Sequence, residues 1–279
     1  MQILDGKKIS QKFAQQMSEQ IFDLKIKPKL VIFQVGDIES SNIYISRKKK
    51  FAEKIGAIVD VKKFDFDISQ EKIISEIYIE NKNKDTHGII VQLPLPENLD
   101  KNLIIDSIDS QKDVDGITST NISKLFRNQE DFIIPATTRG IFELLNEYNI
   151  EFISKKIVVI GRSNLVGKPT AIFFSNKGAT VKVCHSKTTD LSKEITWADI
   201  VISATGQIDL INHKMISQNQ VIIDVGISYD KNKRICGDVN TEKVIVKAIS
   251  PVPGGVGPMT VCCLFKNLFE VYQKQLYNH

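Results

Sequence analysis

The chain of 279 residues carries 37 basic and 33 acidic side chains, a formal net charge of +4, and these charges are interspersed rather than gathered into a basic stripe. That pattern argues against a nucleic-acid surface. The four cysteines show no C-x-x-C spacing, the N-terminus lacks the apolar core of a signal peptide, and no apolar run is long enough to span a bilayer. We therefore expect a soluble cytoplasmic protein with no nucleic-acid or membrane partner, long enough for two domains around a cleft.

In chain order, apolar runs of strand length alternate with stretches of helical periodicity, which predicts an α/β fold. The runs are mostly continuous, as is typical of strands buried on both faces of a parallel sheet. The expected strands are 30–36, 88–96, 156–162, 179–185, 199–206 and 220–226, and the expected helices include 9–26, 43–55 and 259–277. Residues 121–139 lack strong periodicity and carry Pro135 before a new helix, so we place the crossover between the domains there.

Lys48 interrupts the apolar stripe of the helix expected over residues 43–55. At about 100° per residue it shares a face with Tyr44, Phe51 and Ile55, whereas Lys49 and Lys50 point elsewhere. Two interpretations stand side by side. The lysine stem can lie along apolar surface while the ammonium reaches water; alternatively, the amine is partly desolvated and available for acid–base chemistry near neutral pH.

Gln92 lies at the carboxyl end of the expected strand 88–96, the edge where sites gather in open α/β sheets. A buried amide needs hydrogen-bond partners, and Lys48 is a natural one, although an ordinary satisfied strand-end amide fits equally well. The motif KDVDG (112–116) presents Asp113 and Asp115, either as functional carboxylates or as an Asx-type turn. No cluster of histidine or cysteine supports a metal, and the four histidines are scattered, so we expect neither a metal site nor a histidine catalyst.

A strand ending at Gly161 runs into GRSNLVGKP (161–169) and then a helix, where backbone N–H groups can hold a pyrophosphate. The generic dinucleotide fingerprint is only weakly satisfied, and an ordinary strand-to-helix turn is the alternative. The next expected strand ends in CHSK (184–187) without the acidic residue that binds an NAD ribose. Arg162, Ser186 and Lys187 suit a ribose 2′-phosphate, which favours NADP over NAD.

Six motifs together resemble the bifunctional methylenetetrahydrofolate dehydrogenase/methenyltetrahydrofolate cyclohydrolase family. They are YISRK (44–48), VQLPLP (91–96), KDVDG (112–116), GRSNLVGKP (161–169), CHS (184–186) and PVPGGVGPMT (251–260). The likeness covers nearly the whole chain in order. It implies an α/β protein of two domains around a cleft: a folate-binding catalytic domain over residues 1–137, joined by a C-terminal helix (258–279), and a Rossmann-like NADP-binding domain over residues 138–257.

The resemblance further implies a reaction and a role for each matching residue. The reaction is oxidation of 5,10-methylenetetrahydrofolate by NADP⁺ followed by hydrolysis to 10-formyltetrahydrofolate, without a metal and in a homodimer. Tyr44 would stack on the folate, Lys48 would be the catalytic lysine, Gln92 would tune it, and Asp115 would bind the pterin. The remaining substrate contacts would be Leu93, Pro253, Gly254 and Gly255, and the cofactor contacts would be Gly161, Arg162, Ser163, Ser186 and Ile227.

Two segments depart from the family pattern. PATTRG (135–140) replaces P-C-T-P-x-G, which predicts a less rigid crossover, and DIESS (37–41) replaces D-x-P-A-S ahead of Tyr44. Two other functions remain open at this point. One is a dehydrogenase that has lost the cyclohydrolase activity, against which the joint presence of Lys48, Gln92 and Asp115 argues. The other is a folate- or nucleotide-binding protein without turnover, which would have no need of Lys48.

Overall fold

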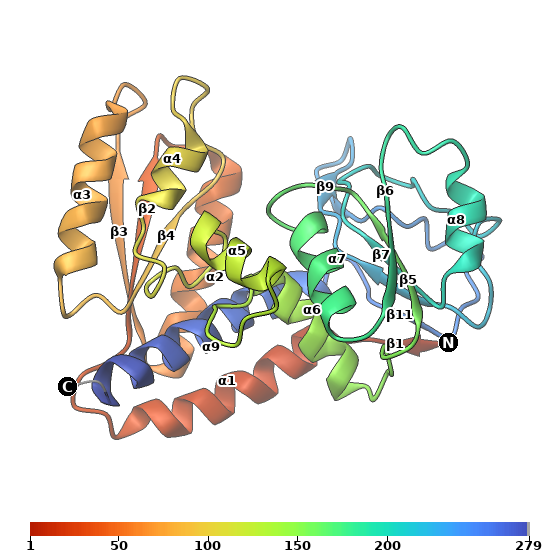
Figure 1. The fold of residues 1–279 in the computed structure, drawn as a ribbon, viewed down its shortest axis with the longest axis horizontal. Coiled ribbons are helices and arrows are strands. Elements are labelled where there is room, and N and C mark those ends of the chain that lie inside the picture. The colour runs from red at the N-terminus through yellow and green to blue at the C-terminus, as the bar shows by residue number, and fades with distance from the viewer. Residues whose placement is uncertain (278–279) are drawn as a thin grey trace. The chain divides into compact units, whose positions relative to one another are not determined.

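The chain divides into two compact units, each built on its own parallel sheet (Figure 1). The computed structural model describes residues 1–277. Unit 1 comprises residues 1–10 and 137–260, and unit 2 comprises residues 11–136 and the chain from Val261 onward. The α/β class expected from the alternation of strands and helices is confirmed.

Unit 2 has a three-stranded sheet in the order β3-β2-β4, with all strands parallel. The helix α3 lies on one side of this sheet and α2 on the other (Figure 1). One face packs buried residues such as Phe33 and Val91 against Ile73, Ile77 and neighbouring side chains of α3 and α4. The elements that begin in this unit are β2 (Lys29–Val35), α2 (Glu39–Ile55), β3 (Ile58–Phe64), α3 (Gln70–Lys82), β4 (Gly88–Val91), α4 (Lys101–Asp106), α5 (Ser119–Phe126) and the first residue of α6 (Ala136–Glu147).

Unit 1 has a six-stranded parallel sheet in the order β1-β11-β8-β7-β5-β6 and a separate antiparallel pair formed by β9 and β10. One face of the sheet buries Val158, Val201 and Ile222 with residues that include Ile195 of α8. The elements are β1 (Gln2–Ile3), β5 (Lys156–Ile160), α7 (Gly167–Asn176), β6 (Thr180–Cys184), α8 (Leu191–Trp197), β7 (Ile200–Ser203), β8 (Val221–Asp224), β9 (Ser228–Tyr229), β10 (Ile235–Cys236) and β11 (Ala248–Ile249).

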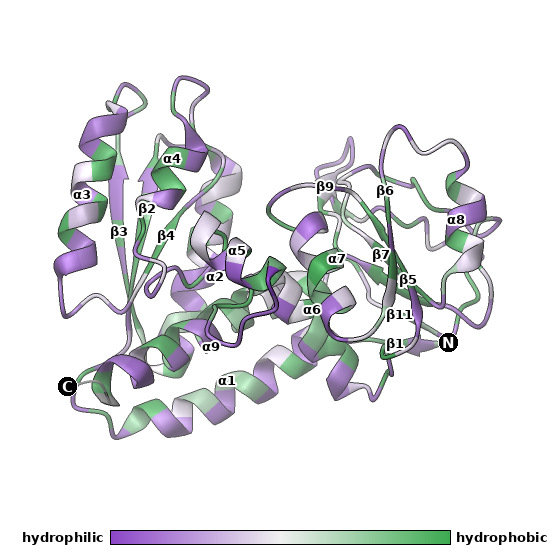
Figure 2. Cartoon of the chain, in the orientation of Figure 1, coloured by the Kyte–Doolittle hydropathy of each residue, from purple (hydrophilic) through white to green (hydrophobic). Residues whose placement is uncertain are grey.

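Two long helices, α1 (Gly6–Phe22) and α9 (Val256–Tyr277), have their first residues in unit 1 and the rest in unit 2. Figure 2 shows hydrophobic and hydrophilic residues alternating along α1, whereas strands such as β4 and β7 are hydrophobic along their length. The burial agrees, because every residue of β4 and β7 is buried. Continuous apolar runs therefore did predict strands covered on both faces.

Several predicted boundaries need correction. The helix expected over 9–26 begins at Gly6 and ends at Phe22, where the Lys27 ammonium donates to the carbonyls of Ile21 and Phe22. The helix expected over 43–55 starts four residues earlier, at Glu39. The strand expected over 88–96 ends at Val91, and Gln92 directly follows it, at the carboxyl end as expected.

Edge strands account for the other differences. The strand β3 was not predicted, because its residues alternate between exposed and half-buried and include charged side chains. The strand β6 was predicted, but as a strand buried on both faces; it is instead the edge of the six-stranded sheet, and Lys182 and Val183 are exposed. The short strand β1 pairs with β11, which places residues 1–10 in unit 1, whereas the expected division counted them with the folate domain.

Polar contacts occupy the two segments that depart from the family pattern. In PATTRG, Thr138 is fully buried and its hydroxyl lies 3.0 Å from that of Thr170 on α7. In DIESS, the buried Ser41 hydroxyl donates to the Leu93 carbonyl at 3.4 Å. Asn42, the next residue, donates to Asp37 at 2.9 Å and accepts from the buried Gln34 amide at 2.8 Å. Thr138 thus forms a side-chain hydrogen bond at a position where the family pattern has a proline, and Ser41 and Asn42 form such bonds two and three residues after the other proline position.

Candidate active site

Lys48 lies on the buried face of α2, together with Ser41, Ile45, Ala52 and Ile55. Its side chain is only 9% exposed, and its Nζ donates to Gln92 Oε1 at 2.9 Å. Burial lowers the pKa of Lys48 below the ordinary value, and the nearby Asp115 charge partly opposes that shift. Of the two interpretations left open by the sequence, the buried and hydrogen-bonded amine agrees with the structure.

Gln92 reaches Lys48 because the ladder between β2 and β4 continues for one residue beyond the strand. Phe33 pairs with Val91, and the Gln92 backbone N–H then donates to the Phe33 carbonyl at 2.9 Å. The Gln92 side chain is buried and its Nε2 donates to the Leu93 carbonyl at 2.9 Å, which fixes the amide so that Oε1 faces Lys48. The pairing of Lys48 with Gln92 expected from the sequence is therefore present.

The two aspartates of KDVDG have different environments. Asp113 is fully buried, and its carboxylate accepts hydrogen bonds from the N–H groups of Gly116 and Thr118 and from the Asn121 amide, at 2.8–2.9 Å. These contacts are those of an Asx-type turn, so Asp113 is structural. Asp115 is half-buried, and among the residues that the structure describes none donates a hydrogen bond to its carboxylate.

Asp115 and Lys48 are electrostatically coupled. Burial raises the pKa of Asp115, and the Lys48 charge opposes this rise. The backbone around Asp115 is held firmly, since the Asn267 amide donates to the Val114 carbonyl at 2.8 Å and the Ala136 N–H donates to the Asp115 carbonyl at 3.1 Å. The carboxylate is thus held in place by its backbone while its own acceptor positions remain available to a donor from outside the protein.

Tyr44 lies one turn of α2 before Lys48 and is half-buried. The Arg47 guanidinium lies 5.7 Å from the centre of its ring, in a cation–π contact. Leu93, also half-buried, contributes its carbonyl to Gln92 and Ser41. The structure therefore gathers Lys48, Gln92 and Asp115 in unit 2, with Tyr44 and Leu93 on the same two segments.

In unit 1 the predicted glycine turn leaves β5 and enters α7. Gly161 has φ +109°, a conformation that favours glycine, and a Cβ there would collide with the Ala204 carbonyl. A Cβ on Gly167 would collide with the Gly161 carbonyl, so the helix begins in direct contact with the strand end. The Ser163 hydroxyl accepts from the N–H groups of Val166 and Gly167 at 3.2–3.3 Å and caps this turn.

Arg162 and Ser186 occupy matching positions on neighbouring strands. Ile160 of β5 pairs with Cys184 of β6, and each predicted residue follows its strand by two positions. Both side chains are exposed. The turn that carries Ser186 is held by His185, whose N–H donates to the Thr188 hydroxyl at 2.9 Å and whose Nδ1 accepts from the Lys187 N–H at 3.1 Å. No acidic residue occurs in 185–189.

The other predicted residues of unit 1 surround the start of α9. Gly254 has φ +114°, and its carbonyl accepts from the Lys7 N–H at 2.9 Å. Gly255 is buried, and a Cβ there would lie 2.6 Å from the Pro251 carbonyl oxygen, whereas Pro253 is exposed. Ile227 follows β8, and its Cδ1 lies 3.8 Å from where a Cβ on Gly257 would be. These residues share a unit with Gly161 and Arg162, not with Lys48.

Sequence reasoning missed two buried aspartates of unit 1, Asp224 and Asp238. Asp224 ends the strand β8, and burial together with the charge of Asp238 raises its pKa to about 7. The available signal was an acidic residue inside the apolar run QVIIDVG (220–226), which is unusual for a strand buried on both faces.

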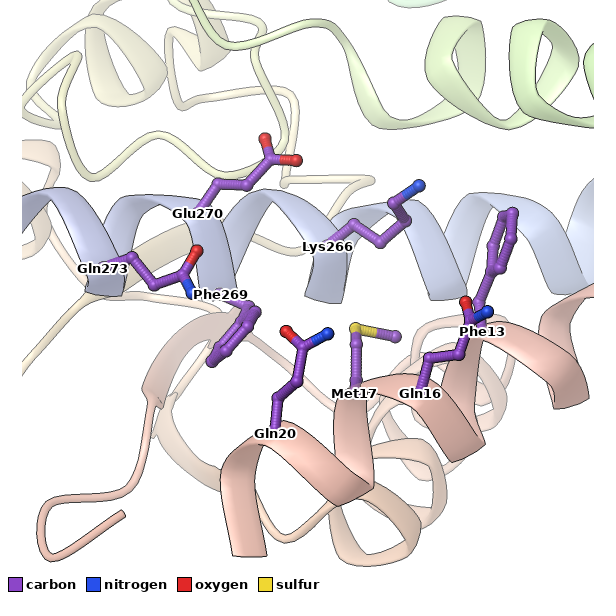
Figure 3. Close-up of a pocket in the computed structure, with 8 residues that line it drawn as sticks. All are labelled: Phe13, Gln16, Met17, Gln20, Lys266, Phe269, Glu270 and Gln273. Carbon is purple, nitrogen blue, oxygen red and sulfur yellow. The ribbon is translucent and has the colours of Figure 1, made fainter. Parts of the chain in front are cut away.

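A shallow cavity of about 180 Å³ in unit 2 contains none of the predicted residues (Figure 3). Figure 3 shows the side chains that line it, which come from α1 and α9: Phe13, Gln16, Met17, Gln20, Lys266, Phe269, Glu270 and Gln273. The Lys266 ammonium lies 4.3 Å from the centre of the Phe13 ring, a cation–π contact between α9 and α1 beside the cavity. Within residues 1–277, no group of three acidic, histidine or cysteine side chains could hold a metal ion, and no helix could cross a membrane.

A dinucleotide-type strand–turn–helix in one unit and a buried lysine beside an unpaired carboxylate in the other define the class: a nucleotide-dependent enzyme with acid–base chemistry. Residues 4–115 match the tetrahydrofolate dehydrogenase/cyclohydrolase catalytic domain, and residues 135–276 match the NAD(P)-binding domain of the same proteins. The chain belongs to the tetrahydrofolate dehydrogenase/cyclohydrolase family. The expected function, an NADP-dependent bifunctional dehydrogenase and cyclohydrolase of one-carbon metabolism, is confirmed.

Individual relatives match along their whole length. The Bifunctional protein FolD of Mycoplasma mobile is 45% identical over 281 residues, covering 99% of each chain. The crystal structure of the bifunctional enzyme FolD from Campylobacter jejuni is 39% identical, with a TM-score of 0.96 over 98% of this chain and 99% of that one. The Trypanosoma brucei dehydrogenase-cyclohydrolase, solved with NADP cofactor and an inhibitor, is 31% identical, with a TM-score of 0.93 over 98% and 97% of the two chains.

Proposed function

We propose that this chain oxidises 5,10-methylenetetrahydrofolate with NADP⁺ and then hydrolyses the 5,10-methenyl product to 10-formyltetrahydrofolate, with Lys48 carrying the proton transfers of the second reaction. The observation that carries this proposal is the buried Lys48 Nζ hydrogen-bonded to Gln92 at 2.9 Å. A purely structural lysine would gain more by reaching water, because burial of an ammonium is costly.

Hydrolysis requires a base for the attacking water and an acid for the departing ring nitrogen. Burial lowers the pKa of Lys48, so its neutral amine is accessible nearer to physiological pH. Gln92 accepts one N–H of Lys48 and thereby orients the remaining valences of the nitrogen. We assign Lys48 as the general base and acid and Gln92 as the residue that orients it.

Asp115 is proposed to bind the amino-pyrimidine edge of the pterin. That edge offers N–H donors, and a carboxylate without a protein donor is their natural acceptor. Tyr44 supplies an aromatic face one turn away, and Leu93 supplies an apolar contact beside Gln92. These contacts would hold the folate for both reactions, because each takes place on the same one-carbon bridge.

Hydride transfer depends on alignment more than on an acid or a base. NADP⁺ supplies the hydride acceptor when it is bound. The turn at Gly161, which requires glycine because a Cβ would collide with the Ala204 carbonyl, leads into the start of α7, where backbone N–H groups would hold the pyrophosphate. Arg162 and Ser186 would bind the 2′-phosphate. Ser163 would hold the turn through its capping hydrogen bonds, and Ile227 would line the cofactor site.

The glycine-rich segment 253–255 is proposed to approach the folate and the nicotinamide. Gly254 adopts a conformation that favours glycine, and Gly255 has no room for a Cβ, so the backbone itself forms the surface. We also propose a homodimer in the cytoplasm. The support is the family expectation and the four free cysteines, which are typical of a reducing compartment.

The experiment that tests the proposal follows absorbance during incubation with methylenetetrahydrofolate and NADP⁺. Continuous formation of NADPH over many turnovers is expected, whereas a binding protein gives at most a stoichiometric change. Methenyltetrahydrofolate alone should then disappear without any nucleotide. A chain that forms NADPH but leaves methenyltetrahydrofolate at the uncatalysed rate would be a dehydrogenase only, and the assignment of Lys48 would be wrong.

A further inference from the structure

Two buried carboxylates connect three segments at the carboxyl edge of the sheet in unit 1. Asp224 ends β8, and Asp238 follows β10; they are 3% and 0% exposed. The strands β7 and β8 are parallel neighbours, and Ser203 pairs with Asp224 at their ends. The carboxyl edge of such a sheet is where a dinucleotide binds.

Asp238 holds the loop that leaves β7. Its Oδ2 accepts from the Ser203 hydroxyl at 2.7 Å and from the Thr205 N–H at 2.8 Å. Asp224 holds the loop that leaves β8 and the segment of Asp238 itself, because it accepts from the N–H groups of Gly226, Asp238 and Val239 at 2.9–3.1 Å. Each loop is therefore fixed by hydrogen bonds to a buried carboxyl group rather than by packing alone.

Each carboxylate packs against a glycine that lies close to the other aspartate in the sequence. A Cβ on Gly226 would collide with the Asp238 carboxylate, and a Cβ on Gly237 would collide with the Asp224 carboxylate. Asp238 Oδ1, which lies over Gly226, has no hydrogen-bond partner among the residues that the structure describes. Buried acceptors are normally satisfied, so this arrangement costs free energy that a simpler loop would avoid.

We propose that Asp224 and Asp238 are positioning residues for the cofactor-dependent reaction, which set the 204–207 and 225–228 loops against the nucleotide. The second loop carries Ile227, a proposed cofactor contact. This inference rests on the proposed function. It predicts that removing the hydrogen bonds of this aspartate pair impairs NADP⁺ binding and hydride transfer. Hydrolysis should be unaffected, since Lys48 and Gln92 lie in the other unit.

The test compares Asp238→Ala with Asp238→Asn. Alanine removes the Oδ2 acceptor of both hydrogen bonds from the β7 loop, so the Kd for NADP⁺, measured by calorimetric titration, should rise about tenfold. The kcat/KM of the dehydrogenase should fall by a similar factor, while hydrolysis stays within about twofold. Asparagine can still accept from Thr205 through its carbonyl, with its amide at the unpartnered Oδ1 position, and should restore most of the NADP⁺ affinity.

A matched control is Asp230→Ala. Asp230 lies in the same segment and accepts from the N–H groups of Asn232 and Arg234, but it is not part of the buried pair. This variant should leave both activities unchanged. Ser203→Ala, which deletes one donor to Asp238, provides a gentler second variant and should shift NADP⁺ affinity in the same direction by a smaller factor.

Unchanged NADP⁺ affinity in Asp238→Ala and Ser203→Ala would overturn the inference, and so would an equal fractional loss of dehydrogenase and hydrolase activities, which indicates general destabilisation. If Asp238→Ala does not fold, Ser203→Ala decides the question by the same two readouts. Failure of the wild-type protein to form NADPH would instead refute the proposed function, whatever the variants show.

Discussion

The buried pair predicted to carry out hydrolysis and the two residues predicted to bind the 2′-phosphate lie in opposite kinds of environment. In unit 2, Lys48 and Gln92 are 9% and 8% exposed and are already hydrogen-bonded to each other. In unit 1, Arg162 and Ser186 are exposed side chains placed by the register of two strands. Burial determines the environment of the first pair, whereas the backbone geometry of two strands determines the position of the second pair.

The difference follows from the chemistry that each site is proposed to perform. Proton transfer near neutral pH needs a lysine whose pKa is lowered, and burial is the largest cause of that shift at Lys48. Recognition of a phosphate needs donors that remain accessible until the ligand arrives, so exposed cations and hydroxyls suffice. Substitutions in the two regions should therefore produce losses of different size and kind.

The largest effect is expected from Lys48→Gln. Hydrolysis of methenyltetrahydrofolate should fall about 10²–10⁴-fold, the usual contribution of general acid–base catalysis, while hydride transfer falls far less. Lys49→Gln, an exposed lysine on the same helix, is the matched control and should retain both activities. Equal fractional losses of both activities in Lys48→Gln would mean that the lysine positions substrate instead.

Asp115→Ala should weaken folate binding by roughly 10- to 150-fold, since a hydrogen bond to a charged group contributes about 1.5–3 kcal/mol. Both reactions should suffer together, because the carboxylate is proposed to hold the substrate in each. Titrations with a folate analogue and, separately, with NADP⁺ measure this. NADP⁺ affinity should hardly change, and an equal loss for the two ligands would make Asp115 a structural residue like Asp113.

Ser186→Asp should lower the preference for NADP⁺ over NAD⁺ by about tenfold in kcat/KM, because a carboxylate beside the 2′-phosphate repels it. The loss should appear mainly in the KM for NADP⁺. Ser192→Asp, at a half-buried position on α8 of the same unit, tests whether added negative charge alone has this effect. A wild-type preference for NAD⁺ would overturn the assignment of Arg162 and Ser186.

A smaller, pH-dependent effect is expected from Asp224. Its folded pKa of about 7 lies above the ordinary value of 3.8, so between these pH values the unfolded chain releases a proton that the folded chain retains. The protonated Asp224 therefore contributes its full stabilisation of the folded state below about pH 4, and this contribution is lost as the pH rises towards 7. In thermal unfolding, Asp224→Asn should lack this decline, so its Tm relative to wild type should increase with pH across that window.

Much of the folate-side site could be predicted from sequence because a charged residue on an apolar helical stripe is conspicuous. Lys48 is a charged residue on the apolar face of α2, and Gln92 follows an apolar run, so both residues can be identified as candidates from the sequence alone. The distinction between Asp113 and Asp115 could not be predicted. It depends on Asn121 and Asn267, which reach the loop from α5 and α9.

On the cofactor side, the strands and the glycine turn were predictable, whereas the edge position of β6 and the pair formed by Asp224 and Asp238 were not. Sheet order depends on which strands become neighbours, and a run such as 179–185 looks the same in the centre or at an edge. The aspartates are 14 residues apart in sequence and meet only through the loop that carries β9 and β10.

The central claim is that proton transfer in hydrolysis and NADP⁺ recognition in oxidation depend on different residues, although both reactions share the folate contacts, and assaying both activities on Lys48→Gln and Ser186→Asp tests it most directly. Each purified variant would be measured for NADPH formation from methylenetetrahydrofolate and for hydrolysis of methenyltetrahydrofolate without nucleotide. The account predicts opposite patterns: Lys48→Gln loses mainly hydrolysis, and Ser186→Asp loses only the NADP⁺-dependent oxidation. Parallel loss of both activities by the same factor in both variants would contradict it.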